Sequence, residues 1–364
     1  MKFTIAKSSL LEGLQTVQNV VGIRSTLPIL ANVLLVGEKN TLTLSTTDLD
    51  VSVRCSVEAN ITKAGASTMP VRRLSSIIRE LPEAEIEIEI DDKDVAIVKC
   101  GSSFFKIIGL SEEEFPPVSK PEGKYVYRID QGVFKEMLKK ASYAASSDET
   151  RYVLNGVFLG FKSGKLTVVA TDGRRLALVE YEVEFPEEAA VEMILPSKTV
   201  NELLHTLADQ GDLKIISKEK QILFEFDKIL IASKLIDGTY PNYKQVIPAQ
   251  CEERVVVERE SLLTALKRVS LVTTNKSNAV KLTFGKNKLS VSSNTPEVGE
   301  ARETIPIKYT GKEISVAFNP EYMMDPLKNL NNDEIFIELT DDLSPGVIKC
   351  DMPFVYVLMP MRIN

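Results

Sequence analysis

The chain has 364 residues, of which 44% are apolar and 26% are charged, so disordered and collagen-like classes are excluded. The formal net charge of −7 argues against nucleic acid as a partner, because phosphates attract lysine and arginine. No segment approaches the roughly 18 apolar residues of a membrane span and residues 1–6 form no signal segment, which predicts a cytoplasmic protein without membrane contact.

The first predicted elements are a short strand and a helix that recur twice along the chain. The pattern Ser-Leu-Leu-x-x-Leu-x-x-Val at 9–17 is repeated at 261–269, and a middle copy begins at Tyr127, 124 residues after Phe3. Pro326 is expected to kink or shorten the last helix. Two helices are predicted in each copy, at 8–18, 71–81, 132–142, 197–207, 260–270 and 319–330.

Strands complete each copy. Residues 42–48 match residues 166–172 at the same offset of 124, and both segments end in Thr-Asp. Glu85–Ile90 alternates strictly, which predicts a strand with one buried face and one solvated face of glutamates.

These patterns predict an α+β fold of three tandem units, each with two helices packed on antiparallel sheets. The predicted domains are 1–120, 127–247 and 253–364. Units of this kind can join sheet edge to sheet edge, which leaves one exposed edge at each end of the array. Pairing end to end with another copy removes both edges and closes a ring when the rotation allows.

Signals for catalysis and metal binding are weak. The cysteines are too far apart in sequence for a zinc or redox motif, and the single histidine, His205, lies in a leucine-rich helical run. No phosphate-binding loop, nucleophile elbow or His-Glu-x-x-His motif occurs. We therefore predict a protein that is not an enzyme and needs no metal or cofactor. The alternative of a metal-dependent enzyme would use Asp48, Asp50 or Asp172, but these acids fit turns between strands. The cysteines, expected to be reduced, are Cys55, Cys100, Cys251 and Cys350.

Six segments carry a more specific signal. They are Met-Lys-Phe-Thr at 1–4, Arg-Ser-Thr-Leu-Pro-Ile-Leu at 24–30, Arg-Tyr-Val-Leu-Asn-Gly at 151–156, Ala-Thr-Asp-Gly-Arg-Arg-Leu-Ala at 170–177, Ser-Lys-Leu-Ile-Asp-Gly with Tyr-Pro at 233–241, and Met-Pro-Met-Arg at 359–362. In this order and spacing the chain resembles the bacterial DNA polymerase III beta subunit family, the processivity sliding clamps. The resemblance covers essentially the whole chain. It implies three DNA-clamp domains per chain, a head-to-tail homodimer, and a ring whose helices line a hole that encircles duplex DNA.

Charge along the chain fits this expectation. The six helical windows contain ten basic and seven acidic residues, a net charge of +3 that leaves −10 for the rest of the chain. A basic lining inside an acidic shell would attract phosphates weakly and without sequence preference. Ordinary charged helix surfaces are the alternative explanation.

The resemblance also implies which residues contact DNA: Arg24, Arg72 and Tyr152, with Lys198 as the repeat partner of Arg72. An acid at Asp148 would repel phosphate, so no contact is assigned to it. For the two arginines the alternative is a solvated surface position.

A second implied surface is a pocket that receives short linear peptides of the clamp loader, of DNA polymerases and of repair proteins. Its apolar walls would accept leucine or phenylalanine anchors, and an arginine at the rim would take a carboxylate or carbonyl. Gln245 and Pro345 depart from the family pattern, so peptide selectivity is expected to differ. The implied pocket residues are Leu154, Thr171, Gly173, Arg174, Arg175, Leu176, Pro241, Val246, Val357, Met359, Pro360, Met361 and Arg362.

The implied dimer contact joins the first domain of one chain to the third domain of the other. It places Phe105 and Ile107 on an edge strand, and Leu271 and Val272 at a facing helix end. The competing function is a repeat-built peptide-binding scaffold that does not encircle DNA.

Overall fold

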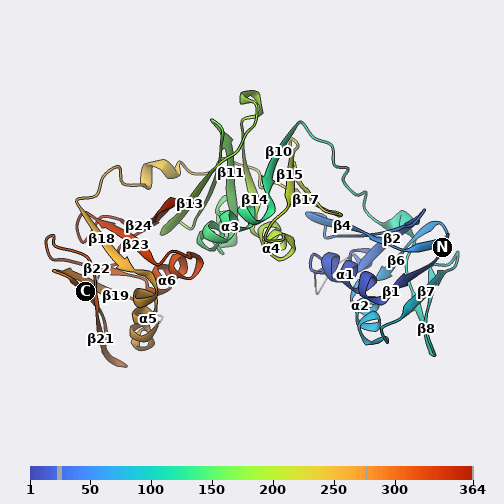
Figure 1. Ribbon diagram of the computed structural model, residues 1–364, viewed down its shortest axis with the longest axis horizontal. Helices are drawn as coiled ribbons and strands as arrows, with labels where there is room; N and C mark the ends of the chain where they lie inside the picture. The colour runs from blue at the N-terminus through green and yellow to red at the C-terminus, as the bar shows by residue number, and fades with distance from the viewer. Residues whose placement is uncertain (23–26, 275–277, 363–364) are drawn as a thin grey trace. The chain divides into compact units, whose positions relative to one another are not determined.

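The computed structural model describes residues 1–22, 27–274 and 278–362, which form two compact units (Figure 1). One unit comprises Met1–Lys135 with Lys198–Leu235, and the other comprises Glu136–Ser197 with Ile236–Asn364. Each unit contains one eight-stranded antiparallel sheet and one smaller sheet. None of the described helices is long and apolar enough to cross a membrane.

The described ranges hold six α-helices, each within one residue of its predicted window. Apolar residues three and four positions apart bury one face, as Leu10, Leu14 and Val17 do in the first helix. The helices carry twelve basic and seven acidic residues, a net charge of +5 rather than the predicted +3, because the first and fifth helices each gain a basic residue at their start, Lys7 and Arg259. They are α1 (Lys7–Gln18), α2 (Val71–Glu80), α3 (Gln131–Ala141), α4 (Ser197–Thr206), α5 (Arg259–Val269) and α6 (Pro320–Asn329).

Pro326 lies inside α6 without ending it, so the predicted shortening is wrong. Proline has no N–H, which leaves the carbonyl of Tyr322, one turn earlier, without its helical donor. The Tyr356 hydroxyl donates to that oxygen over 2.7 Å. At the other end of the helix, the Asn319 side chain accepts from the amide of Glu321 over 2.9 Å and caps the first turn.

The eight-stranded sheet of the first unit joins strands from the first and middle copies. Its order is β10-β15-β16-β17-β4-β3-β2-β6, and the copies meet between β17 and β4, where Ser233 lies opposite Val51. The strands are β2 (Asn32–Glu38), β3 (Thr41–Thr47), β4 (Val51–Glu58), β6 (Gly65–Pro70), β10 (Tyr125–Asp130), β15 (Asp212–Ser217), β16 (Gln221–Phe226) and β17 (Ile229–Lys234).

A five-stranded sheet completes this unit in the order β5-β1-β7-β8-β9. In β7, Ile86 and Ile88 are buried while the Glu87 and Glu89 carboxylates contact the Lys2 ammonium, which confirms the predicted solvated face. The strands are β1 (Lys2–Ala6), β5 (Asn60–Lys63), β7 (Glu85–Ile90), β8 (Val95–Cys100) and β9 (Ser103–Ile108).

The second unit repeats this plan with the middle and last copies. Its eight-stranded sheet has the order β14-β11-β12-β13-β25-β24-β23-β18, and its four-stranded sheet the order β21-β20-β19-β22. Figure 1 shows α5 and α6 beside these strands. The strands are β11 (Gly156–Lys162), β12 (Lys165–Thr171), β13 (Arg175–Glu182), β14 (Val191–Pro196), β18 (Glu253–Glu258), β19 (Val280–Gly285), β20 (Lys288–Thr295), β21 (Gly299–Pro306), β22 (Ile314–Phe318), β23 (Glu334–Leu339), β24 (Gly346–Cys350) and β25 (Met352–Leu358).

The two large sheets join neighbouring copies in the same way. β17 of the middle copy pairs with β4 of the first, and β25 of the last copy pairs with β13 of the middle one. By the same repeat, β9 in the first copy corresponds to β17 and β25, and β21 in the last copy corresponds to β4 and β13. Among the described strands, β9 and β21 are both edge strands of their sheets.

Candidate functional site

The turn between β12 and β13 supplies one wall of the predicted pocket. The Thr171 hydroxyl donates to the carbonyl of Arg175 over 2.6 Å and accepts from the amide of Gly173 over 3.1 Å. Asp172 Oδ1 accepts from the amides of Arg174 and Arg175 over 2.8 and 3.0 Å. Gly173 has φ +84°, a conformation that glycine adopts without steric penalty. Local hydrogen bonds therefore define the backbone conformation of this turn.

Apolar side chains from five strands and a loop form the predicted floor. Predicted residues Leu154, Leu176 and Val357 pack in one cluster with Phe158 and Tyr240, whose ring centroids lie 5.3 Å apart. Leu176 and Val357 are each only 2% exposed, so they contribute shape to the predicted floor and little exposed surface.

Residues near the end of the chain lie against the turn, where the resemblance places another wall of the pocket. The Met359 amide donates to the carbonyl of Arg174 over 3.0 Å, and the Met361 amide donates to the carbonyl of Ala317 over 2.7 Å. Both methionine side chains are exposed, as is Val246 in the short 3-10 helix Tyr243–Val246. Flexible methionines beside a packed floor suit apolar anchors of varied shape. Pro241 and Arg362 are exposed, and Pro360 is half-buried.

The two adjacent arginines of the turn have different environments. The Arg174 side chain is exposed, and no ion pair or hydrogen bond of its guanidinium occurs within the described residues. The Arg175 side chain is only 11% exposed, and its guanidinium contacts Asp172 and Asp325. Burial alone would lower the pKa of Arg175, but Tyr356 and the two carboxylates raise it above the ordinary value. Arg174 is thus the arginine available at the rim.

Two of the predicted DNA contacts, Arg72 and Lys198, lie at the start of helices, and a third, Tyr152, lies in a 3-10 helix. Arg24 falls outside the described residues. Arg72, at the start of α2, is exposed and donates to the carbonyl of Val21 over 2.9 Å. Lys198, at the start of α4, contacts the Asp48 carboxylate and keeps its side chain 49% exposed. Among the described residues no carboxylate forms an ion pair with Arg72, whereas Lys198 already has an acidic partner.

Tyr152 lies in the 3-10 helix Glu149–Leu154 and is strongly exposed. Asp148 caps this helix, accepting from the amide and the hydroxyl of Thr150 over 3.0 and 2.7 Å. The hydrogen bonds from Thr150 lower the pKa of Asp148, so it stays charged at neutral pH. Asp148 therefore caps the 3-10 helix that carries Tyr152.

The predicted dimer residues differ in accessibility. Leu271 is strongly exposed in the 3-10 helix Ser270–Val272, and Phe105 is exposed on β9. Ile107, by contrast, is only 3% exposed and packs in the core. It contributes backbone to the open edge of β9 rather than an accessible side chain. Phe104 and Ile108, which sequence reasoning missed, are 59% and 73% exposed on the same strand.

Side-chain chemistry elsewhere is unremarkable. Among the described residues, no three His, Cys, Asp or Glu side chains gather as metal ligands would. Asp48 Oδ1 accepts from the amides of Asp50 and Val51, which confirms its assignment as a turn acid. His205 is exposed on α4, and burial raises the pKa of the Cys55 thiol to about 12.

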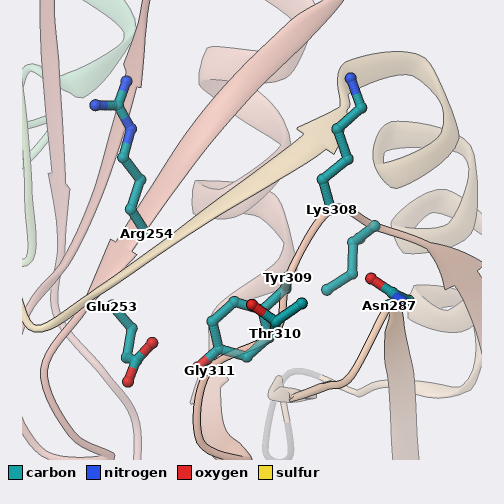
Figure 2. Close-up of a pocket in the computed structure, with 8 residues that line it drawn as sticks. Glu253, Arg254, Asn287, Lys308, Tyr309, Thr310 and Gly311 are labelled. Carbon is teal, nitrogen blue, oxygen red and sulfur yellow. The ribbon is translucent and has the colours of Figure 1, made fainter.

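A cleft of about 430 Å³ in the second unit holds none of the predicted site residues (Figure 2). Its charges already have partners: the Lys308 ammonium contacts Glu334 at 2.5 Å, and the Arg254 guanidinium lies 4.0 Å from the centre of the Phe336 ring. Such a cleft offers little to a charged ligand. It is lined by Glu253, Arg254, Asn287, Ile307, Lys308, Tyr309, Thr310 and Gly311.

Family models match the chain in three consecutive segments. They are the DNA polymerase III beta subunit N-terminal domain at residues 1–119, the central domain at 128–242 and the C-terminal domain at 244–362.

Whole proteins give the same result. A beta sliding clamp of Chlamydia muridarum is 33% identical over 364 residues, covering all of both chains. A crystal structure of the DNA polymerase III subunit beta from Pseudomonas aeruginosa is 33% identical and superposes with a TM-score of 0.95 over all of both chains. A DNA polymerase sliding clamp from Bacillus subtilis, 31% identical, superposes with a TM-score of 0.96, also over all of both chains.

Proposed function

The chain belongs to the DNA polymerase III beta subunit family, and from this premise we propose that two copies pair head to tail into a ring around duplex DNA. The chain is a DNA sliding clamp, a non-catalytic processivity subunit, as its similarity to beta sliding clamps over its full length indicates. The proposal concerns how two chains close the ring and which residues contact DNA and protein partners.

The observation that carries the proposal is the pair of equivalent open edges. Within the chain, a strand of one copy pairs with a strand of the next at β4–β17 and again at β13–β25. The equivalent strands of the outer copies, β9 and β21, have no partner on their outer side among the described strands. Pairing β9 of one chain with β21 of another repeats the same junction a third time. Because each chain has both edges, two such contacts in a dimer leave neither edge strand unpaired.

Exposed apolar residues support this pairing. Phe104, Phe105 and Ile108 lie on β9, and the 3-10 helix that carries Leu271 and Val272 contacts β21. An unpaired strand edge with large apolar side chains favours association. Domain boundaries at 1–120, 127–247 and 253–364 would then give six similar domains in the ring.

For DNA, we assign Arg24, Arg72, Tyr152 and Lys198 to contacts with the backbone, supported by the helices' net charge of +5. Contacts to phosphate hold the duplex without reading bases, which a sliding protein requires. We place the protein in the cytoplasm.

For protein partners, we assign the pocket between the Thr171–Arg175 turn and the end of the chain to short linear peptides of the clamp loader and DNA polymerases. The apolar floor, exposed methionines and the free Arg174 suit a peptide with leucine or phenylalanine anchors and an acidic group. Gln245 is exposed near this pocket and is a candidate determinant of selectivity.

Retention on DNA tests the ring. After loading by a clamp loader, the protein should stay on closed circular duplex and leave when the circle is cut, because a ring slides off free ends. A scaffold that only binds peptides would be retained equally poorly on both. The variant with Leu271→Ala and Val272→Lys should be monomeric by mass and lost from circles, since it removes apolar contact and adds charge. Val126→Lys, a charge added at another exposed apolar site, is the matched control and should remain dimeric. An unchanged dimer mass in the double variant would contradict the interface.

A further inference from the structure

We propose that Asp325 of α6 is a positioning residue for the peptide pocket. It holds Arg175 inside the protein, so that Arg175 fixes the Thr171–Arg175 turn while Arg174 alone contacts an acidic group of the peptide. The inference rests on the proposed peptide pocket and assigns different roles to its two arginines.

Arg175 is held from four directions. Its Nε donates to Asp172 Oδ2 over 3.0 Å, its Nη1 donates to Asp325 Oδ2, and its Nη2 donates to the carbonyl of Tyr143 over 2.7 Å. The guanidinium also lies 4.2 Å from the centre of the Tyr322 ring. Turning outward to a ligand would leave Asp172, 14% exposed, without its cation, and would leave Asp325, 25% exposed, only the Lys328 ammonium at 3.9 Å. Removing one partner of a buried ion pair is strongly unfavourable.

A chain of hydrogen bonds connects α6 with the pocket wall. Asp172 uses its two oxygens in different directions, with Oδ2 on Arg175 and Oδ1 on the amide of Arg174. The backbone position of Arg174 therefore depends on Asp172, which depends on Arg175 and, through it, on Asp325. The helix end is itself fixed, because the Tyr356 hydroxyl bonds the Tyr322 carbonyl beside Asp325.

The first unit provides an internal comparison. Its equivalent turn has Asp48 in place of Asp172, but Val51 occupies the position of Arg175 and is buried. Asp48 instead pairs with Lys198, which is half exposed. The same backbone turn thus exists without the buried arginine. The contact of Arg175 with Asp172 and Asp325 is therefore a separate feature of the junction where the peptide pocket is proposed.

Measurements of peptide affinity and of its salt dependence distinguish the proposed role of Arg174 from that of Arg175. The probe is a fluorescein-labelled short peptide with leucine and phenylalanine anchors and one glutamate, measured by anisotropy well below the melting temperature. Asp325→Asn should weaken binding about fivefold to tenfold with an unchanged salt dependence, because it misplaces the wall without removing a peptide contact. Arg174→Gln should weaken binding and reduce the salt dependence. Replacing the peptide glutamate by glutamine should abolish the Arg174→Gln effect and leave the Asp325→Asn effect.

Asp48→Asn, the same change at the equivalent junction, is the matched control and should leave peptide affinity unchanged. Wild-type affinity in Asp325→Asn would overturn the proposal. So would a reduced salt dependence in Arg175→Lys with none in Arg174→Gln, since Arg175 would then contact the peptide.

Amide hydrogen exchange measures how firmly the Thr171–Arg175 turn is held, in the absence of any peptide. The amides of Arg174 and Arg175 should exchange faster in Asp325→Asn than in the wild type, whereas unchanged exchange contradicts the proposal. If the wild-type protein fails to bind the probe but this acceleration occurs, the assigned pocket is wrong and the positioning of the turn stands.

Discussion

The β4–β17 junction and the β13–β25 junction share one backbone plan. In both, an aspartate, Asp48 or Asp172, accepts from the amides two and three residues ahead over 2.7–3.0 Å. In both, the residue that follows the last paired residue of the partner strand donates its amide to a carbonyl of the turn. Lys234 donates to Asp50 over 2.8 Å, and Met359 donates to Arg174 over 3.0 Å. Sequence repetition therefore preserves the hydrogen bonds that shape the turn.

The side chains at the same places differ. Arg175 lies between Asp172 and Asp325 at one junction, whereas the other has Val51 and pairs Asp48, 21% exposed, with Lys198, 49% exposed. The backbone plan alone thus suffices to join two copies. The buried charges are a separate feature, and substitutions at the two junctions can measure what each contributes.

The largest expected effect is loss of stability when the buried cation is removed. Arg175→Met leaves Asp172 without its cation and leaves Asp325 only the Lys328 ammonium, 3.9 Å away, so the free energy of unfolding should fall by about 3 kcal/mol. Lys198→Met removes a half-exposed cation and should change it by less than about 1 kcal/mol. Differential scanning calorimetry measures both, since the chain has no tryptophan for fluorescence. Equal losses in the two variants would show that the junctions do not differ in this way.

A smaller effect is expected from the turn backbone. Gly173 and its equivalent, Leu49, have φ of +84° and +80°, and only glycine tolerates this region freely. Gly173→Ala also brings a Cβ to 3.2 Å from Arg151 Nη1, and should lower stability by about 1 kcal/mol. Leu49→Gly should raise stability by about 0.5 kcal/mol, because it relieves the strained position. Thermal melts of both variants check the opposite signs, and a loss in Leu49→Gly would mean that its side chain makes a stabilising contact.

Much of this architecture follows from the sequence because its determinants are local. Helical periodicity and Asx turns depend on residues a few positions apart, so the six helices and the turn at Asp172 are predictable. The contact of Arg175 with Asp325 joins residues 150 positions apart in sequence, so no local sequence pattern predicts it. Phe105 and Ile107 have the same strand parity, yet only Ile107 is buried. Burial on an edge strand depends on what packs over each part of it, which tertiary structure alone decides.

The smallest expected effect concerns Glu202, which occupies in α4 the place of Asp325 in α6 and forms no ion pair with an arginine among the described residues. Burial raises the pKa of Glu202, opposed by Thr206, His205 and Lys198. A carboxyl whose folded pKa lies above its unfolded value adds stability below the unfolded pKa, and this is lost as the pH rises through the folded pKa.

Glu202→Gln should therefore raise the melting temperature at about pH 7 and change it little at about pH 4. Asp130 is the control of opposite sign, because hydrogen bonds from the amides of Gly211 and Val133 lower its pKa. Its stabilisation is present above the unfolded pKa and is lost as the pH falls through the folded pKa. Asp130→Asn should lower the melting temperature at about pH 7 more than at about pH 4. If Glu202→Gln also lowers it at neutral pH, the ionised carboxylate has a partner equivalent to Arg175, and the two junctions are more alike than their side chains indicate.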